Sequence, residues 1–335
     1  MNKNAHGGDI YTYAKERAIS ASDVIDLSSN INPLSIKLDF DTLDVKAYPD
    51  IRYDRLRKEL SKKYGVKKRE IALFSGASAA IFSLIRGARK DVTLFAPLYG
   101  EYKRACELFD KKIRLINRFE EPYEDIVAKS TVIFVNPSTP DGKYEDMRAL
   151  LELCMKKRCE LIVDESFLEF TEKKSATVFL KEFDDLKIVK SLTKFYSCAG
   201  VRVGAVISSK RHISKLMKNE PSWMISTFDQ RYILQALKDE DFVKRTHKFF
   251  KKERKRVFKL LKRSPLIERV YKSDVNFFLI KLKYPYNAKK LQSLCDKENI
   301  LVRDCGNFDF LDDSYVRIAV KGEKETKALK RVLLA

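Results

Sequence analysis

The sequence predicts an α/β protein, with a large domain built on a mostly parallel central sheet and a smaller α+β C-terminal domain. Two patterns predict this class. Through the middle of the chain, short apolar runs rich in β-branched residues alternate with helical patterns, as is typical of parallel strands joined by crossover helices. After about residue 240 a long basic helical pattern begins, and shorter strands and helices follow it. We therefore expect domains over 46–240 and 241–335, preceded by an N-terminal arm over 1–45.

The elements of the large domain are predicted in order along the chain. Six runs read as buried strands, because each is short, apolar and rich in β-branched residues. They cover 91–95, 112–116, 131–135, 160–164, 186–190 and 203–207. Helical patterns cover 78–90, 100–110 and 144–158. Ligands of open α/β sheets bind beyond the carboxyl ends of the strands, so we expect the functional residues at those ends.

The smaller domain is predicted to begin with a long basic helix over about 240–263, which follows a helix that starts near 229. Its later strands are predicted at 276–282, 300–304 and 315–320, and its later helices at 287–297 and 322–334. The first 45 residues show no regular pattern. We expect them to pack on the small domain or on a partner subunit.

The composition is that of a folded protein. The chain has 335 residues, of which 44% are hydrophobic and 11% aromatic, enough for a sizeable core. No run approaches the ~18 apolar residues of a membrane span, and the opening MNKNAHGGDIYTYAKERA lacks the pattern of a secretory signal. The six cysteines are scattered, which favours reduced thiols and a cytoplasmic location. No cysteine or histidine cluster completes a zinc site, so we expect no metal.

The net charge of +20 has two interpretations. A basic chain can bind nucleic acid, or it can bind small anionic ligands. The lysines are spread along the chain, often on helix faces such as 251–263, and charge runs of this kind are usually solvated. Zinc-finger spacing and RNA-binding aromatic signatures are both missing. We therefore expect neither a nucleic-acid partner nor a membrane partner.

Polar residues stand where the predicted sheet would open. The segment SGAS (75–78) lies between an apolar run and a helix, where backbone N–H groups and a hydroxyl can bind an anion. An ordinary helix cap is the alternative for this segment. Tyr99 follows the strand at 91–95, and Asp164 ends the strand at 160–164. A carboxylate at the end of a buried strand needs a cation or a hydrogen-bond donor, although Asp164 can also cap the segment that follows.

The loop SLTKFYSCAGVRVG (191–204) gathers hydroxyls and two cations between two strands. The hydroxyls of Ser191 and Thr193 and the planar guanidinium of Arg202 suit a phosphate. Lys194 lies among them. Because Arg202 opposes its charge, we expect Lys194 to have a lowered pKa and to act as an amine nucleophile.

One ligand would use all of these groups together. It carries a phosphate, an aromatic ring that packs on Tyr99, a ring nitrogen that needs the carboxylate of Asp164, and an aldehyde that reacts with a lysine. That ligand is pyridoxal 5'-phosphate.

The chain resembles the fold-type-I pyridoxal-phosphate enzymes of the aminotransferase class I/II group over nearly its whole length. The spacing of SLTKFY and G-x-R-x-G in the loop 191–204 carries this resemblance. Within the group the chain is most similar to the threonine-phosphate decarboxylases, which are close relatives of the histidinol-phosphate aminotransferases. The opening HGGDIYTYAKERAISASDVIDLSSNINPL (6–34) favours the decarboxylase branch, and the segments 47–53, 300–308 and 315–320 also match.

The resemblance implies a function for each matching residue of the cofactor site. Lys194 is the catalytic residue that binds the cofactor covalently, Asp164 pairs with the ring nitrogen, and Tyr99 stacks on the ring. The cofactor phosphate is implied to be held by Ala77, Ser78, Ser191, Thr193 and Arg202.

The resemblance also implies a homodimer and a small anionic phospho-amino acid substrate. Tyr48 matches a tyrosine that reaches the cofactor phosphate of the other subunit. Arg317 matches the arginine that binds the substrate carboxylate. His6, Asn30 and Arg303 lie in matching segments that line the substrate site, and a purely structural role is the alternative for these three.

The chain departs from the usual family pattern at several positions. The family usually reads N-P-T-G where this chain reads TPDG (139–142), so Thr139 replaces the asparagine that binds the phenolic oxygen of the cofactor. The hydroxyl of Thr139 can still donate with a shorter reach, and Asn136 is a weaker substitute. Ser75 replaces the asparagine that the family usually carries in a G-N-G turn. Phe167 is the residue of the decarboxylases, where the aminotransferases carry a tyrosine, and Lys321 replaces a second arginine.

Three hypotheses about function follow. The first is a decarboxylase of O-phospho-L-threonine or O-phospho-L-serine, and the second is a histidinol-phosphate aminotransferase or another phospho-substrate aminotransferase. The third is a basic, non-catalytic nucleic-acid-binding or regulatory protein on the same scaffold. A protein that gains no new absorption band when pyridoxal phosphate is added would favour the third hypothesis.

Overall fold

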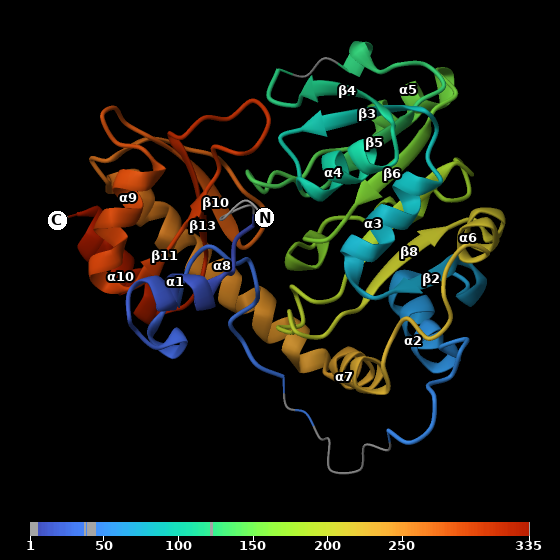
Figure 1. Ribbon diagram of the computed structural model, residues 1–335, viewed down its shortest axis with the longest axis horizontal. Helices are drawn as coiled ribbons and strands as arrows, with labels where there is room; N and C mark the ends of the chain where they lie inside the picture. Colours follow the sequence, from blue (N-terminus) through green and yellow to red (C-terminus); the bar gives the residue numbers. More distant parts are fainter. Residues whose placement is uncertain (1–5, 37, 39–44, 121–122, 335) are drawn as a thin grey trace.

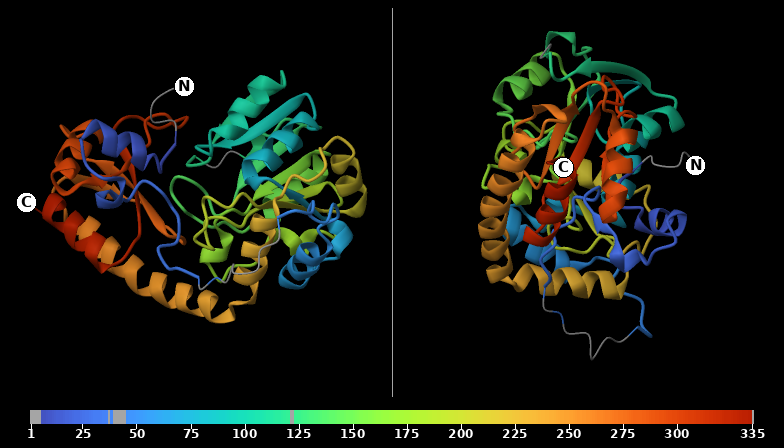
Figure 2. Two further views of the ribbon diagram at one scale, coloured as in Figure 1. Left: turned by 60° about the horizontal axis from the view of Figure 1, so that its bottom comes forward. Right: turned by 90° about the vertical axis from the view of Figure 1, so that its left-hand side faces the viewer.

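The computed structural model describes residues 6–36, 38, 45–120 and 123–334 (Figure 1). A large domain and a small domain lie side by side. Helix α8 (Glu240–Arg263) extends from α7 (Thr227–Lys238), beside the large domain, to the small domain (Figure 2). Within the described residues, no helix combines the length and the apolar character that a membrane crossing requires.

The large domain is built on a seven-stranded sheet in the order β2-β8-β7-β6-β5-β3-β4. Its strands are β2 (Ile71–Phe74), β3 (Asp91–Ala96), β4 (Lys112–Asn117), β5 (Thr131–Val135), β6 (Glu160–Asp164), β7 (Leu186–Ser191) and β8 (Gly204–Ser208). The pairs from β7 to β4 are parallel, whereas β8 is antiparallel to both of its neighbours. The prediction of a mostly parallel sheet is therefore confirmed.

One predicted strand is not fully buried. The run at 112–116 forms β4, which is the last strand of the sheet order and has a partner on one side only. Lys112 and Arg114 of this strand are exposed. The prediction of a buried strand was wrong here because an edge strand needs few apolar side chains.

Helices cover both faces of the large sheet. The helices α3 (Gly76–Arg86), α4 (Glu101–Leu108) and α6 (Lys210–Met217) pack on one face, and α2 (Asp54–Tyr64) and α5 (Arg148–Lys156) pack on the other. The packed residues of α3 recur at helical spacing, and they include Ala80, Ile81, Leu84 and Ile85. The helices predicted at 78–90, 100–110 and 144–158 correspond to α3, α4 and α5. Helix α3 begins and ends earlier than predicted, and α4 and α5 are shorter at both ends.

The small domain has a four-stranded antiparallel sheet in the order β12-β13-β10-β9. Its strands are β9 (Ile267–Val270), β10 (Phe277–Leu282), β12 (Arg303–Asp304) and β13 (Tyr315–Ala319), and its helices include α9 (Ala288–Cys295) and α10 (Glu323–Leu333). The strand predicted at 300–304 divides into β11 (Ile300–Leu301) and β12, because β11 pairs with a segment of the N-terminal arm. The domain boundary placed at 240 and 241 stays a prediction, and it falls at the start of α8.

The N-terminal arm is more regular than its sequence predicts. It forms α1 (Ile10–Glu16) and β1 (Ile25–Asp26), and β1 pairs in parallel with β11. The hydroxyl of Tyr13 donates to Asp296 at 2.9 Å, and Arg17 donates to the same carboxylate at 2.7 Å. The arm thus packs on the small domain, while its residues 1–5, 37 and 39–44 lie outside the described residues.

Short 3₁₀ helices complete the fold. They are η1 (Ala21–Asp23), η2 (Lys68–Glu70), η3 (Tyr123–Asp125), η4 (Leu168–Phe170), η5 (Ala176–Phe179) and η6 (Asp296–Glu298).

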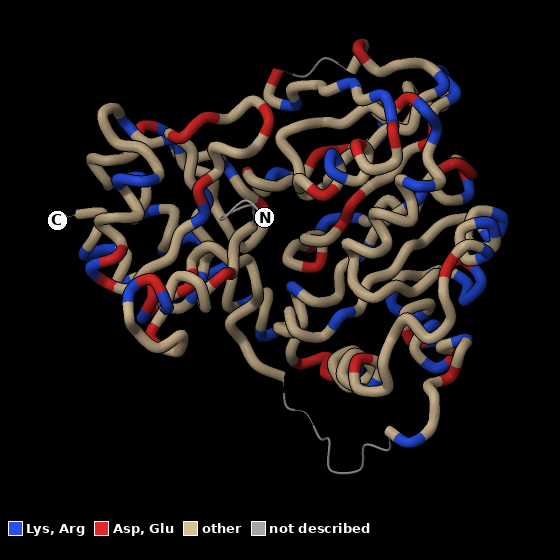
Figure 3. The backbone as a smooth tube through the Cα atoms, viewed as in Figure 1, with Lys and Arg blue, Asp and Glu red and all other residues tan. Residues whose placement is uncertain are grey.

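Lys and Arg are distributed along both domains and are interspersed with Asp and Glu (Figure 3).

Candidate active site

A cavity of about 730 Å³ opens where the carboxyl ends of the large sheet meet the small domain and the N-terminal arm. Thirteen of the fourteen residues that the sequence assigned to the cofactor or substrate site line it. They are His6, Asn30, Ala77, Ser78, Tyr99, Thr139, Asp164, Ser191, Thr193, Lys194, Arg202, Arg303 and Arg317. Tyr48 does not line the cavity of its own chain. Its side chain is 81% exposed, and its ring lies 4.8 Å from that of Trp223.

Lys194 lines this cavity. Its Nζ donates to Ser191 Oγ at 3.2 Å, and it lies 5.2 Å from the centroid of the Phe167 ring. Burial lowers the pKa of Lys194 from 10.5 to about 8; Asp164 opposes this effect, and Arg202 and Arg317 add to it. The sequence predicted the direction of this shift but attributed it to Arg202, whereas burial is the larger cause.

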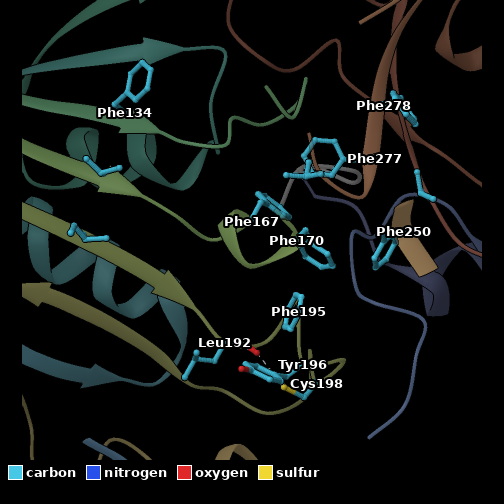
Figure 4. Close-up of a cluster of buried hydrophobic side chains, with 14 of the residues drawn as sticks. Phe134, Phe167, Phe170, Leu192, Phe195, Tyr196, Cys198, Phe250, Phe277 and Phe278 are labelled. Atoms are coloured by element: carbon cyan, nitrogen blue, oxygen red, sulfur yellow. Dashed lines mark hydrogen bonds between the residues drawn. The ribbon is translucent and has the colours of Figure 1, made fainter. Parts of the chain in front are cut away.

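An aromatic cluster anchors the loop that carries Lys194. Phe195 lies 5.2 Å from Phe170, which lies 5.3 Å from Phe250 of α8, and Phe167 lies 5.0 Å from Phe277 of β10 (Figure 4). The rings come from both domains. Because their burial is coupled, the loop keeps one conformation relative to the cavity.

The N-terminal arm also holds this loop, through a residue that sequence reasoning missed. Asn32 N donates to the carbonyl of Lys194 at 3.0 Å, Asn32 Nδ2 donates to the carbonyl of Phe195 at 2.9 Å, and the hydroxyl of Ser197 donates to Asn32 O at 2.7 Å. Asn32 belongs to the NINPL segment that carried the family resemblance, and that was the available signal.

The start of α3 and the side chain of Arg202 lie together at one end of the cavity. Ser75 is the N-cap residue of α3 but makes no capping hydrogen bond through its side chain, so an ordinary cap does not account for this segment. Gly76 has φ +84°, and a Cβ built on it would lie 2.6 Å from Arg202 Nη2. A Cβ on Gly204 would lie 2.5 Å from Ala77 N. The two glycines therefore let the guanidinium and the helix start approach one ligand.

Hydroxyl groups surround the same end of the cavity. Ser78 Oγ lies 3.4 Å from the hydroxyl of Tyr99, and Ser191 Oγ lies 3.1 Å from Thr193 Oγ1. Burial raises the pKa of Tyr99, so its hydroxyl stays protonated near neutral pH. These groups, the guanidinium of Arg202 and the first N–H groups of α3 are the donors that a phosphate needs.

Asp164 is buried and is held by two donors. Its Oδ2 accepts from the hydroxyl of Tyr102 at 2.9 Å, and its Oδ1 accepts from Ser166 N at 2.8 Å. The second contact is the local cap that the sequence left open as an alternative. Tyr102, which is fully buried on α4, was missed by sequence reasoning because no local pattern links two residues 62 positions apart.

Arg317 links the small domain to the cofactor side of the cavity. It donates to Thr139 Oγ1 at 3.1 Å and to Ser28 O at 2.9 Å. Burial lowers its pKa to about 10, and Arg303 adds to the effect while Cys305 opposes it. Thr139, at 5% exposed, thus accepts from Arg317 and keeps its own O–H available to donate. Asn136 does not line the cavity, because its side chain bonds the backbone of Glu145.

The remaining predicted substrate residues differ in their surroundings. His6 Nε2 lies 3.0 Å from Glu101 Oε1, an acidic partner that the sequence did not predict. Asn30 Oδ1 is buried and has no hydrogen-bond partner within the part of the chain that the structure describes. Arg303 donates to Asn307 Oδ1 at 2.7 Å, and burial lowers its pKa.

An ion pair at the cavity was not predicted from the sequence. Lys103 of α4 donates to Asp309 of the small domain at 2.5 Å, and both residues line the cavity.

Outside the cavity, the side chains of Asp184, Asp185 and His212 lie close together, but Arg211 donates to both carboxylates. A salt-bridge network accounts for that group.

The residues present fit pyridoxal phosphate. The cavity holds a lysine of lowered pKa, a buried carboxylate and a tyrosine, with hydroxyl and guanidinium donors beside the glycines Gly76 and Gly204. Asp164 acts on Lys194 with one negative charge and Arg202 and Arg317 act on it with two positive charges, and this excess of positive charge suits bound anions.

Comparisons with known proteins point the same way. The model of the family described as aminotransferase class I and II matches residues 22–333. The threonine-phosphate decarboxylase of Salmonella typhimurium is 26% identical over 98% of this chain and 96% of that protein. The adenosylcobalamin biosynthesis bifunctional protein CobDQ of Leptospira interrogans is 28% identical over 98% of this chain, which spans 40% of that longer protein. The solved histidinol-phosphate aminotransferase of Clostridium acetobutylicum has a TM-score of 0.84 and 30% identity, covering 92% of this chain and 97% of that one.

Proposed function

This chain belongs to the aminotransferase class I and II family, whose members use pyridoxal 5'-phosphate, and on that premise we propose that it decarboxylates an O-phospho-L-amino acid. The proposed reaction converts L-threonine phosphate to aminopropanol phosphate, or L-serine phosphate to ethanolamine phosphate. The two substrates differ by one methyl group, which a pocket distinguishes by only about 1–3 kcal/mol.

The pairing of Arg303 with Arg317 carries this proposal. The two arginines are directly opposite each other in the register of β12 and β13, and both line the cavity. Both are nearly buried, at 6% and 9% exposed, so their charges repel with little screening. An anion relieves that repulsion. A phospho-amino acid brings a carboxylate and a phosphate for this pair, whereas Arg202, whose guanidinium lies beside the start of α3, would bind the cofactor phosphate.

Each residue of the site has a proposed task in the reaction. Bound pyridoxal phosphate supplies an electron-withdrawing ring that accepts the electron pair left when a bond to the substrate Cα breaks. Asp164, held by Tyr102, would pair with the ring nitrogen. Tyr99 would pack on the ring, and Thr139 would donate its hydroxyl to the phenolic oxygen. Ala77, Ser78, Ser191, Thr193 and Arg202 would hold the cofactor phosphate.

Arg317 and Lys194 are the residues that would choose and complete the reaction. The bond that lies perpendicular to the ring breaks most easily, so the orientation in which Arg317 holds the substrate carboxylate selects loss of carbon dioxide or of the Cα hydrogen. Lys194, with a pKa of about 8, exchanges its proton near neutral pH and would deliver a proton to Cα after carbon dioxide leaves.

A homodimer belongs to the same proposal. Tyr48 is remote from the cavity of its own chain, and its side chain is 81% exposed. A tyrosine presented in this way is available to a second copy of the chain. In the proposed dimer it reaches the cofactor phosphate of the other subunit.

A phospho-substrate aminotransferase, such as a histidinol-phosphate aminotransferase, is the second candidate. The specific observation in its favour is the likeness to the solved histidinol-phosphate aminotransferase of Clostridium acetobutylicum at 30% identity. Phe167 favours the decarboxylase, because the resemblance described above places phenylalanine in the decarboxylases and tyrosine in the aminotransferases.

The experiment that tests the proposal compares products. Purified protein with pyridoxal phosphate is incubated with O-phospho-L-threonine, with O-phospho-L-serine, and with histidinol phosphate plus 2-oxoglutarate. Carbon dioxide from a phospho-amino acid supports the proposal, and unphosphorylated threonine is the matched control for the phosphate. The Lys194→Ala variant is the control for catalysis. Glutamate without carbon dioxide would establish the aminotransferase instead.

A further inference from the structure

A buried ion pair lies behind the strands that carry two of the cofactor-site residues. Lys190 Nζ lies 2.5 Å from Glu165 Oε2, and both side chains are 2% exposed. Neither residue lines the cavity, and the proposed reaction uses neither. Two charges in an interior are costly to desolvate, so this pair calls for a physical explanation.

The pair is adjacent in sequence to the site. Glu165 directly follows Asp164 at the end of β6, and Lys190 directly precedes Ser191 at the end of β7. Since successive side chains of a strand point to opposite faces, Asp164 and Ser191 face the cavity while Glu165 and Lys190 face the side of α2. Glu165 N also donates to Val189 O at 2.9 Å. The ion pair therefore joins β6 to β7 at the level where the cavity residues emerge.

Every polar contact of the pair ties another segment to this point. Glu165 Oε2 accepts from the hydroxyl of Ser175 at 2.6 Å, and Oε1 accepts from Ala176 N at 2.6 Å. Lys190 Nζ donates to the same hydroxyl at 3.2 Å and lies 4.6 Å from the centroid of the Tyr64 ring. The pair thus connects β6, β7, the start of η5 and the end of α2.

Stability alone does not explain such a pair. A buried ion pair is typically no more stabilising than apolar side chains of similar volume, whereas its directional bonds fix the groups around it. We propose that the Glu165–Lys190 pair is a positioning device that holds the ends of β6 and β7 so that Asp164 and Ser191 face one cofactor. This inference rests on the proposed function in that these two residues bind pyridoxal phosphate.

The double variant Glu165→Gln/Lys190→Met tests the proposal. It removes both charges and keeps similar volumes, and the glutamine oxygen can still accept from Ala176 N, so we expect the midpoint of thermal unfolding to change little. We expect the dissociation constant for pyridoxal phosphate to increase about 10-fold or more, by analogy with metal sites, where removal of the outer partner of a ligand typically costs about 10- to 100-fold in affinity. The pH midpoint of the bound cofactor's absorbance is expected to shift as well, because Asp164 and Lys194 set it. If the pair only stabilised the fold, the loss of affinity for pyridoxal phosphate would come with a matching loss of thermal stability.

The chain offers a matched control on the same two strands. Lys187 Nζ lies 3.0 Å from Glu160 Oε2, at the opposite ends of β7 and β6, and their side chains are 10% and 15% exposed. The double variant Glu160→Gln/Lys187→Met is expected to bind pyridoxal phosphate as the wild type does. Equal affinities of the two double variants would overturn the inference, whether both are weakened or neither is.

Single variants keep the test decisive if the first double variant does not fold. Glu165→Gln keeps the size and the hydrogen-bonding capacity of the side chain but removes its charge, and we expect weaker cofactor binding than in Glu160→Gln. Lys190→Arg, which keeps the charge, is expected to retain more affinity than Lys190→Met. The reverse order in either comparison would overturn the inference. Wild-type protein that binds no pyridoxal phosphate would overturn the proposed function as well, so the two failures are distinguishable.

Discussion

Replacement of Lys194 by methionine is expected to stabilise the cofactor-free protein at neutral pH. The pKa of Lys194 falls from 10.5 to about 8 in the folded chain, mainly through burial. At about 1.36 kcal/mol per pKa unit, this difference corresponds to about 3 kcal/mol. Below pH 8 the lysine is charged in both states, so the folded protein bears the full cost. Methionine removes the charge and fills a similar volume.

The sign of the pH dependence follows from proton binding. Between pH 8 and 10.5 the unfolded chain holds a proton on Lys194 that the folded chain has lost, so the free energy of unfolding rises with pH. The wild type is therefore expected to gain up to about 3 kcal/mol across this window relative to Lys194→Met. The stability advantage of the variant is largest at neutral pH and disappears as the pH approaches 10.5.

The assay is urea unfolding of both proteins without cofactor, measured in parallel over the range from about pH 7 to about pH 10. Lys190→Met is the control, because the same substitution there leaves the buried Glu165 without its cation. It is expected to lose about 3–5 kcal/mol throughout the range. A Lys194→Met variant that is less stable than the wild type by the same amount at every pH would refute the reasoning.

Three further substitutions test the cofactor site and the proposed contact between subunits. Gly76 has φ +84°, and the Cβ of Gly76→Ala would lie 2.6 Å from the guanidinium of Arg202, so we expect the variant to lose about 1–3 kcal/mol of unfolding free energy in urea and to bind pyridoxal phosphate more weakly. Gly200→Ala is the control, because its Cβ meets nothing within 4 Å, and it should change neither quantity. Tyr102→Phe removes one donor from the buried Asp164 and is expected to cost about 1–3 kcal/mol of unfolding free energy; unchanged stability and cofactor affinity would argue against that hydrogen bond. Tyr48→Ala is expected to weaken cofactor binding while changing stability by no more than about 0.5 kcal/mol, and wild-type affinity would contradict the proposed contact between subunits.

The sequence predicted which residues lie together at the site, but it did not predict the hydrogen bonds that hold them there. Lys194, Asp164 and Arg202 were expected together because the carboxyl ends of parallel strands share one edge of a sheet, and the structure places all three on one cavity. The residues that hold them were missed. Tyr102 and Asn32 act on partners 62 and more positions away, and no periodicity or spacing encodes such a pairing.

Strand direction and edge position were also beyond the sequence. The run 203–207 has the same apolar pattern as the runs of the parallel strands, yet β8 is antiparallel. The sequence did not predict this, because a short apolar run carries no signal of strand direction. The run 112–116 was predicted as buried although β4 is an edge strand. The split of 300–304 depends on β1, which no local pattern in the arm predicted.

The pairing of β1 with β11 has a consequence for synthesis on the ribosome. Ile25 pairs with Ile300, so the first strand to be made waits for a partner translated 275 positions later. Sequence-distant pairing of this kind carries a loop-closure cost and forms late. During elongation, the large sheet can assemble while the arm stays undocked. Since Asn32 of that arm bonds the loop of Lys194, we expect these bonds to form only after the small domain has emerged. We therefore expect the cofactor site to be completed late in synthesis.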